Sequence, residues 1–306
     1  MRPLAGFVVV LGQVCATAMT WTVWMSFLAV TGLGTVGNAQ TEMHLAPGSN
    51  VLALTRAAPA GSIFTFAPGT YYLPTPIEPK PGDTYRASGE VRLTGAISLG
   101  SASREGDVWV LADAPILDDT THGRCDDEFR RCDVRHDVYL DGVPLIHVAA
   151  PEQLGEGRWY YEAAERRILL GDDPTGRVLE IGMGEGAFHG NANHVTIEGF
   201  IIEKFANPAQ VGAIHAYGDL VPIMPGYAWV VRNNIVQLNH GTGIMVGYGA
   251  TVTGNRILRN GQLGLMGKGG ENMRVTGNEI AYNNYARFRF HWEGAGAKFR
   301  RTHNTL

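Results

Sequence analysis

Three basic residues in the last forty positions of the chain, Lys268, Arg289 and His291, are the side chains best suited to chemistry. Arg289 or Lys268 could neutralise the carboxylate of a uronic acid. Lys268 or His291 could then take the proton from the carbon next to that carboxylate. Because β-elimination and C5 epimerisation both begin with this proton transfer, we assign these three residues candidate catalytic roles.

Four further residues are candidates for substrate binding: His215, Tyr217, Glu293 and Lys298. The chain carries a formal net charge of −4, so a cationic patch on it would suit an anionic partner. The alternative is that these are ordinary solvated side chains on an exposed sheet. Hydrolysis is disfavoured, since the aligned positions hold no pair of acids on neighbouring rungs.

A repeated phrase indicates the elements that would position these residues. VTGNRILRN (252–260) and VTGNEIAYN (275–283) follow VRNNIVQLN (231–239), with VTIEGFIIEKF (195–205) as a degenerate first copy. The asparagines Asn234, Asn255 and Asn278 are 21 and 23 residues apart. This interval, with β-branched residues and glycine, predicts one coil of extended chain per repeat and a stacked asparagine ladder at one corner.

The ladder also predicts a register. Ten residues beyond each asparagine stand Ile244, Leu265 and Phe288, which we expect to face inward together with Ile214. Strand alternation then turns the neighbouring residues outward. The outward sets are His215, Met245, Met266 and Arg289 in one column and Tyr217, Gly247, Lys268 and His291 in the next. Gly247 would leave a shallow groove between Tyr217 and Lys268.

These repeats resemble those of right-handed parallel β-helix proteins of the pectin-lyase-like superfamily. FAPGTYYL (66–73), IEPKPGDTY (77–85) and LTGA (93–96) resemble the opening rungs of the same group. The resemblance covers roughly residues 60–100 and 190–300 and is more specific for fold than for reaction. The superfamily includes lyases, epimerases, hydrolases and non-enzymatic surface proteins, and calcium is a frequent partner of its lyases.

The expected fold is therefore all-β: a right-handed parallel β-helix over residues 40–306, with a β-rich insert at about 101–185. Within the insert, RWYYEAAERRILL (158–170) could be a helix by composition. We favour a hairpin that turns at Ala163–Arg166, because GDDPTG (171–176) supplies another turn at once. Cys125 and Cys132 are expected to form a disulfide. The chain stops where another rung should start, so further rungs are expected beyond it.

Residues 1–39 are apolar, with small residues at 37–39, and predict a cleaved secretory signal peptide. A retained signal anchor and an over-extended start are the alternatives, because the apolar run is long enough to span a bilayer. The expected location is secreted, periplasmic or at the cell surface. Membrane contact is expected only if the segment is retained. The absence of a basic stripe argues against nucleic acid as a partner.

Three aspartate pairs, Asp118–Asp119, Asp126–Asp127 and Asp172–Asp173, could supply oxygen ligands for calcium. Adjacent aspartates are more often turn residues, so we name calcium as a candidate cofactor but assign no metal ligand. The function expected is β-elimination or C5 epimerisation of an acidic polysaccharide. The alternative is a non-catalytic carbohydrate-binding or surface protein.

Overall fold

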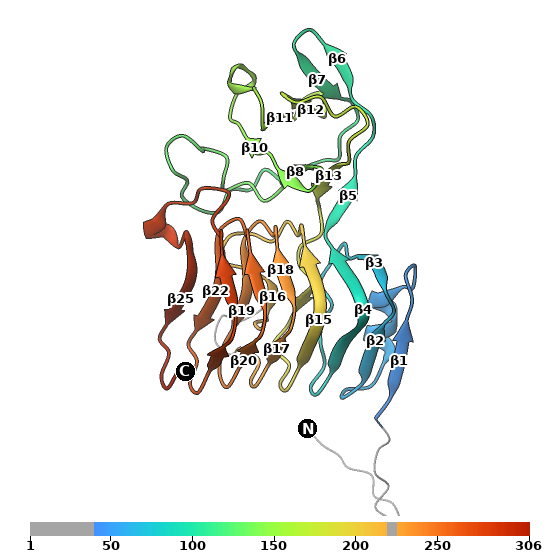
Figure 1. Ribbon diagram of the computed structural model, residues 1–306, viewed down its shortest axis with the longest axis vertical. Helices are drawn as coiled ribbons and strands as arrows, with labels where there is room; N and C mark the ends of the chain where they lie inside the picture. The colour runs from blue at the N-terminus through green and yellow to red at the C-terminus, as the bar shows by residue number, and fades with distance from the viewer. Residues whose placement is uncertain (1–39, 219–224) are drawn as a thin grey trace, which may run out of the picture. The chain divides into compact units, whose positions relative to one another are not determined.

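Each Val-Thr-Gly-Asn repeat forms two short strands in one coil of a parallel β-helix (Figure 1). Figure 1 shows a computed structural model of the chain, which describes residues 40–218 and 225–306. The expected signal peptide, residues 1–39, lies outside the described residues. No helix within the described residues has the length and apolar character needed to cross a membrane.

Successive coils pair in parallel through one large sheet, which we call sheet A. Its main path runs through β1 (Glu42–Leu45), β2 (Ile63–Phe66), β4 (Thr84–Thr94), β15 (Thr196–Glu203), β17 (Val230–Arg232), β20 (Thr251–Thr253) and β23 (Arg274–Thr276). Shorter strands, β3 (Gly69–Tyr72), β18 (Ile235–Gln237), β21 (Arg256–Leu258) and β24 (Glu279–Ala281), extend it. The degenerate first copy belongs to this series, since Ile197 lies opposite Val231.

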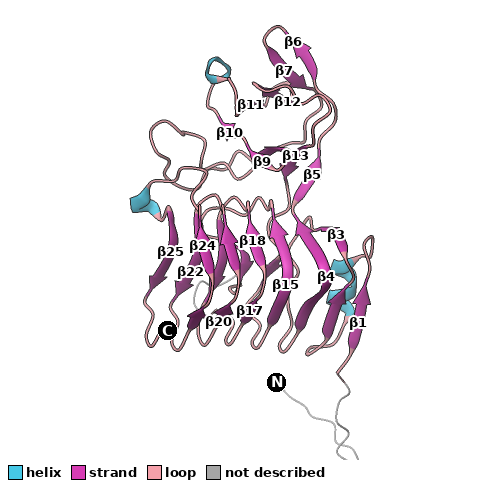
Figure 2. Cartoon of the chain, in the orientation of Figure 1, coloured by secondary structure: helices cyan, strands magenta, loops and turns pink. Residues whose placement is uncertain are grey.

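A second parallel sheet, sheet B, closes the coil. In spatial order it contains β14 (Phe188–His189), β16 (Gly212–His215), β19 (Thr242–Val246), β22 (Leu263–Lys268) and β25 (Ala295–Arg300). Figure 2 shows the strands of the coil side by side, with loops at their ends. Ile214, Ile244 and Leu265 lie opposite one another and are fully buried, as the sequence predicted.

The core lies between the two sheets. Val231 and Val252 of sheet A and Ile244 and Leu265 of sheet B belong to one buried cluster. The short helix α1 (Val51–Ala57) packs its Val51 against the same cluster. Burial of this continuous apolar column is the main stabilising contribution to the coil.

The predicted asparagine ladder is present, and it is double. Asn234 Nδ2 donates to Asn255 Oδ1 at 3.0 Å, and Asn255 Nδ2 donates to Asn278 Oδ1 at 2.9 Å. Five residues further along each coil, Asn239, Asn260 and Asn283 repeat the arrangement at 2.9 and 3.0 Å. Each buried side chain also bonds main-chain groups of the adjacent coil, so both edges of the strand pair are fixed by amide side chains.

Between β4 and β14 the chain leaves the coil and builds two antiparallel-rich sheets. Sheet C contains β5 (Ala96–Ser98), β13 (Leu179–Gly182), β8 (Val138–Leu140) and β9 (Val143–Pro144). Sheet D contains β10 (Ile146–His147), β11 (Arg158–Glu162), β12 (Arg167–Leu170), β7 (Val108–Leu111) and β6 (Ser103–Glu105), with the 3₁₀ turn η1 at Pro151–Gln153. We call this segment the insert.

Two predictions about the insert are confirmed. β11 and β12 pair antiparallel as a hairpin, with Trp159 opposite Leu170 and Arg166 in the left-handed conformation at the turn. Cys125 and Cys132 are joined by a disulfide. Trp159, Ile168 and Leu140 are buried in a core that belongs to the insert itself.

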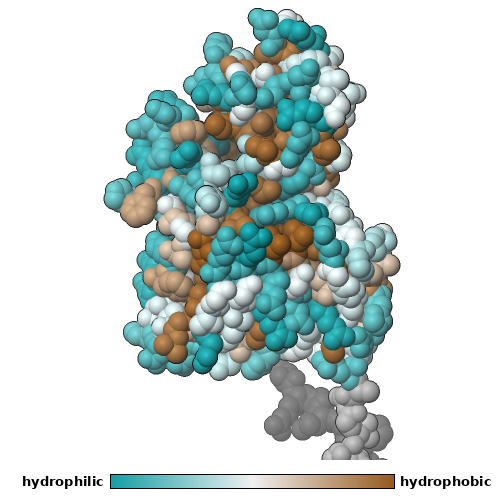
Figure 3. Space-filling model, in the orientation of Figure 1, coloured by the Kyte–Doolittle hydropathy of each residue, from teal (hydrophilic) through white to brown (hydrophobic). Residues whose placement is uncertain are grey.

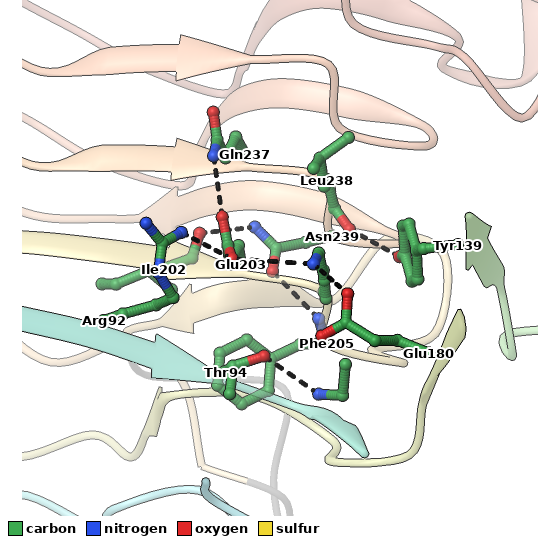
Figure 4. Close-up of polar contacts among 12 residues, drawn as sticks. Arg92, Thr94, Tyr139, Glu180, Ile202, Glu203, Phe205, Gln237, Leu238 and Asn239 are labelled. Carbon is green, nitrogen blue, oxygen red and sulfur yellow. Dashed lines mark hydrogen bonds and ion pairs between the residues drawn. The ribbon is translucent and has the colours of Figure 1, made fainter. Parts of the chain in front are cut away.

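Buried polar groups join the insert to the coil (Figure 4). The Lys204 ammonium of the coil donates to Glu180 of β13 at 2.5 Å, and the Tyr139 hydroxyl of β8 donates to the Leu238 carbonyl at 2.8 Å. Next to them, Glu203 accepts from Arg92 at 2.7 Å and from Gln237 at 2.7 Å. Figure 3 shows apolar surface gathered in the band where the insert meets the coil.

Candidate functional site

The outward-facing residues of sheet B form two adjacent rows. The register places His189, His215, Met245, Met266 and Lys298 opposite one another along the first row. Two residues further along the strands, Lys268 lies opposite Arg300. We call this surface the outer face of sheet B and define it by His189, His215, Tyr217, Lys268, Lys298 and Arg300.

The predicted register was wrong at β25. Met266 faces Lys298 rather than Arg289, and Lys268 faces Arg300 rather than His291. The inward partner of Leu265 is likewise Ala297 and not Phe288. The cause is an excursion of the chain over residues 284–294, which includes the 3₁₀ turn η2 (Phe290–Trp292), before the coil resumes.

Arg289 and His291 therefore do not join Lys268. Arg289 Nε donates to the Cys125 carbonyl at 2.8 Å, and its guanidinium pairs with Asp127 of the disulfide loop. His291 lies in η2 with its side chain exposed. Phe288 is fully buried, in a cluster with Cys125 and Cys132. These contacts give Arg289 and Phe288 a role in holding the insert against the coil.

Tyr217 and Lys268 do come together, but no groove separates them. The Tyr217 hydroxyl donates to the Lys268 carbonyl at 2.5 Å, and the Lys268 ammonium lies 5.9 Å from the centre of the Tyr217 ring. A Cβ atom on Gly247 would meet Pro225 at 2.4 Å and the Tyr217 hydroxyl at 3.1 Å. The space that the missing side chain leaves is thus filled by these two residues. Burial raises the pKa of Tyr217.

His189 and His215 are neighbours in the first row, with ring centres 5.1 Å apart. His215 Nδ1 accepts from the Gly212 amide at 3.1 Å, and His189 Nε2 donates to the Gly212 carbonyl at 2.9 Å. Burial, helped by His189 and Lys268, lowers the pKa of His215 to about 3. His215 is therefore neutral at physiological pH, with its proton on Nε2, and can donate one hydrogen bond.

Glu293 and Lys298 form an ion pair. Gln210 of the coil connects this pair to a side chain of the insert. Lys298 Nζ donates to Glu293 Oε1 at 2.5 Å, and Gln210 Nε2 donates to Glu293 Oε2 at 2.9 Å. Gln210 Oε1 in turn lies 3.1 Å from His122 Nε2 of the insert. Glu293 has a positive φ of 71°, which is uncommon for a residue with a side chain. Its carboxylate is thus held at one end of the first row.

The second row presents two cations that no carboxylate of the described residues neutralises. Lys268 and Arg300 are cross-strand neighbours, and neither forms an ion pair with a carboxylate of the described residues. Like charges that face each other across adjacent strands destabilise a sheet. An anion bound between them would remove this cost, so the pair is the strongest electrostatic indication of a ligand on this face.

Sequence reasoning missed Arg300, Gln210 and His122. Arg300 could have been found from the alternation in AGAKFR (295–300), which places Lys298 and Arg300 on one face and Ala297 and Phe299 on the other. Gln210 and His122 carry no such signal, because their contact joins segments 88 residues apart.

Both aspartates of one pair bind main-chain amides, and only Asp173 does so within its own turn. Asp172 accepts from the Gly157 amide at 2.7 Å, and Asp173 accepts from the Thr175 amide at 2.8 Å. Over residues 40–218 and 225–306, no three His, Cys, Asp or Glu side chains are grouped so that they could hold a metal ion.

Comparison with known proteins supports the fold. A family model described as a right-handed β-helix region matches residues 220–306. A solved complex of XylC with xylose matches with a TM-score of 0.67 and 18% identity, covering 87% of this chain and 58% of that one. The chain thus spans less than two thirds of that structure. No curated protein matches this chain.

Two weaker structural similarities accompany it. A glycoside hydrolase matches with a TM-score of 0.47 and 12% identity over 78% of this chain and 73% of its own. The tailspike of Pseudomonas phage phi297 matches with a TM-score of 0.26 and 11% identity, covering 81% of this chain and 44% of its own. From the strand register, the family model and the XylC match, the chain has a right-handed parallel β-helix fold.

Proposed function

We propose that this protein is exported, binds an acidic polysaccharide across the outer face of sheet B, and acts on its uronate residues. The observation that supports this proposal is the Lys268–Arg300 pair, two neighbouring cations with no acid of the described residues to neutralise them. The fold similarity to a protein solved with xylose supports a carbohydrate as the partner in general. The Cys125–Cys132 disulfide supports folding in an oxidising compartment outside the cytosol.

The residues of the outer face suit recognition of a uronate. The planar guanidinium of Arg300 can hold a carboxylate through two parallel hydrogen bonds. The neutral His215 can donate from Nε2 to a sugar hydroxyl. Lys268 stands over the Tyr217 ring, beside both groups.

The reaction we propose starts with proton removal at C5. With the substrate carboxylate on Arg300, Lys268 first releases its ammonium proton to water. Its amine then takes the C5 proton, and the electron pair is delocalised into the carboxylate. Expulsion of the C4 oxygen, which takes a proton from water, then gives an unsaturated uronate and a shortened chain. Return of a proton from water to the opposite face of C5 gives the C5 epimer instead.

The test uses two variants and one matched control. Arg300→Met should weaken binding of polygalacturonate or alginate about 10- to 100-fold, the effect of losing one charge-assisted contact. Lys268→Met should abolish the product while most of the binding is kept. Arg274→Met is the control, because Arg274 is also exposed and unpaired among the described residues but lies in β23 of sheet A.

The readouts are binding by calorimetry, ultraviolet absorbance of the unsaturated product and NMR of the product for epimerisation. Binding without any product from the wild-type protein would support the non-catalytic alternative, a carbohydrate-binding surface protein. Equal binding by wild type, Arg300→Met and Arg274→Met would refute the outer face of sheet B as the site.

A further inference from the structure

The first coil of sheet A lacks a strand that every later coil of the described chain has. In the later coils the sheet has strand at two positions, one in line with β2 and the next in line with β3 (Figure 1). Among the described residues, the first coil has only β1, at the first position. Ser49 N donates to the Ala46 carbonyl at 3.0 Å, and Gly48 between them has a φ of 85°. This is the geometry of a tight turn, so the chain leaves the sheet here and enters α1.

The edge of β3 that faces the missing strand is unpaired. Leu73 N donates to the Thr94 carbonyl of β4 at 3.0 Å. Main-chain groups of successive residues in a strand point alternately to its two neighbours, so Tyr71 also bonds to β4, while Thr70 and Tyr72 point away from it. The N–H and C=O groups of Thr70 and Tyr72 have no hydrogen-bond partner among the described residues. They form the row of donors and acceptors to which another strand can pair.

A groove runs beside this edge, and we call it the β3 groove. Residues 48–52 line one side and residues 70–74 the other. Its volume is about 390 Å³, within the range of about 300–1,000 Å³ that is typical of ligand sites. Neither range contains a charged residue, so the groove suits an uncharged ligand.

The alternation of β3 indicates which side chains such a ligand should carry. The side chains of Thr70 and Tyr72 are exposed, whereas Tyr71 and Leu73 are buried in the core of the coil. Val51, which also lines the groove, belongs to the same core. A strand beside β3 shares its two faces. Apolar side chains therefore suit the inward face of an added strand, and small polar side chains suit the outward face.

We propose that the β3 groove binds an uncharged, extended peptide segment of another protein, which adds a strand to β3. The main chain of the peptide bonds to Thr70 and Tyr72, and its alternate side chains determine which sequences fit. The β3 edge of a second copy of this chain is excluded as the occupant, because the same residues 48–52 border it there. The inference does not rest on the function proposed above.

The experiment uses the whole chain and the capped peptide Lys-Thr-Val-Thr-Val-Thr-Lys, whose terminal lysines oppose pairing of the peptide with itself. Calorimetry should show saturable binding. Hydrogen exchange at the Thr70 and Tyr72 amides should slow about tenfold or more, while exchange in β19 and β22 stays unchanged. Because these two amides have no partner among the described residues, their protection reports strand pairing directly.

Two N-methylated peptides test the hydrogen bonds without any change to the protein. Methyl groups on the threonine amides block one edge of the peptide strand, and methyl groups on the valine amides block the other. Only one edge of a strand can face β3, so one methylated peptide should bind about tenfold more weakly than the other, or worse. Equal affinities of the two methylated peptides would overturn the proposal.

Thr70→Pro is the protein variant, and His44→Pro is its matched control. Proline at position 70 removes an N–H group that faces the free edge and places its ring in the groove, and edge strands tolerate proline at such positions. The main chain of His44 also points to a free edge, since the neighbouring Leu45 carbonyl accepts from Ala67 N of the next coil, but His44 lies outside the groove lining. Thr70→Pro should weaken peptide binding about tenfold or more at an unchanged thermal midpoint, whereas His44→Pro should bind as wild type does.

Several outcomes would overturn the proposal. One is wild-type protein that does not bind the unmodified peptide, and another is folded Thr70→Pro that binds it as wild type does. Stronger protection of residues 70–72 by xylohexaose than by the peptide would make the groove a carbohydrate site instead. A dimer in analytical ultracentrifugation that Thr70→Pro abolishes would make it an interface between copies of this chain.

Discussion

At the residue scale, asparagine stabilises the coil because its side chain both donates and accepts. Asn255 Oδ1 accepts from the amide and side chain of Asn234, while its Nδ2 donates to the Val231 carbonyl and to Asn278. Serine or aspartate could not make all of these bonds at once. The requirement for one residue type at one corner explains why the repeat is so visible in the sequence.

Asn255→Ala should lower the free energy of unfolding by about 2–3 kcal/mol, since it leaves buried donors and acceptors of two neighbouring coils unpaired. Chemical denaturation measures the change. Asn191→Ala is the matched control, because Asn191 is exposed and makes no hydrogen bond in the described part of the chain. A loss below 1 kcal/mol for Asn255→Ala would mean that the ladder contributes little.

His215 predicts a pH dependence of stability. Its pKa in the folded protein is about 3, against an ordinary value of 6.5, so the unfolded chain binds the proton first as pH falls. The folded state is then fully favoured above pH 6.5 and loses stability between pH 6.5 and 3, at about 1.4 kcal/mol per pH unit for one proton. His136 and His147, whose pKa values are also lowered, contribute in the same direction.

His215→Gln should reduce the slope of unfolding free energy against pH by about one proton between pH 6 and 4. The measurement is a series of denaturant titrations at constant ionic strength. Equal slopes for the variant and the wild type would show that His215 is protonated in the folded protein.

At the element scale, the repeat predicts which residues lie opposite each other only where successive coils contain the same number of residues. Counting ten residues from Asn234 and from Asn255 reaches Ile244 and Leu265, which do lie opposite each other. From Asn278 the true partner, Ala297, is 19 residues away, because the excursion at 284–294 lengthens the coil. Phe288 was predicted as the partner because it is apolar and ten residues from Asn278. It is buried, but in a different cluster.

The insert was predictable only in its local parts. The β11–β12 hairpin follows from a turn between two β-rich runs, and the disulfide from two nearby cysteines. The antiparallel pairing of β13 with both β5 and β8 joins strands far apart in sequence, with no repeat to mark the register. The same limit applied to the candidate site. The Glu293–Lys298 contact is local in sequence, whereas the Lys268–Arg300 pairing could be predicted only with the correct length of the last coil.

The disulfide loop gives a prediction for a single element. Cys125→Ser with Cys132→Ser should lower the unfolding free energy by about 2–3 kcal/mol, from the entropy of a loop of about eight residues. Because Cys125 bridges to Phe288 and accepts from Arg289, hydrogen exchange should rise at 125–132 and 286–292. Exchange in β19 and β22 should not change. Faster exchange throughout the coil would contradict a local role for the loop.

At the scale of the whole molecule, a few buried polar contacts decide whether insert and coil act as one body. Asp137 accepts from both His240 and Tyr285 of the coil, and Tyr139 donates to the coil at Leu238. Desolvation of these groups is costly unless every partner stays in place. A small cavity at this junction is bordered by the same Asp137 and Tyr285, so its shape depends on these contacts.

Tyr285→Phe should therefore loosen the junction more than the coil. The change removes one donor from a buried carboxylate and should cost about 1.5–3 kcal/mol. Tyr282→Phe is the matched control, because Tyr282 is 75% exposed and its hydroxyl makes no hydrogen bond within the described residues. Hydrogen exchange should accelerate in β8, β10 and the 129–132 segment, while the amides of β19 and β22 keep their protection, since the asparagine ladders and the apolar column remain intact. Equal acceleration of exchange in the insert and in β19 and β22 would contradict this prediction. It would show that the insert and the coil unfold as one cooperative unit.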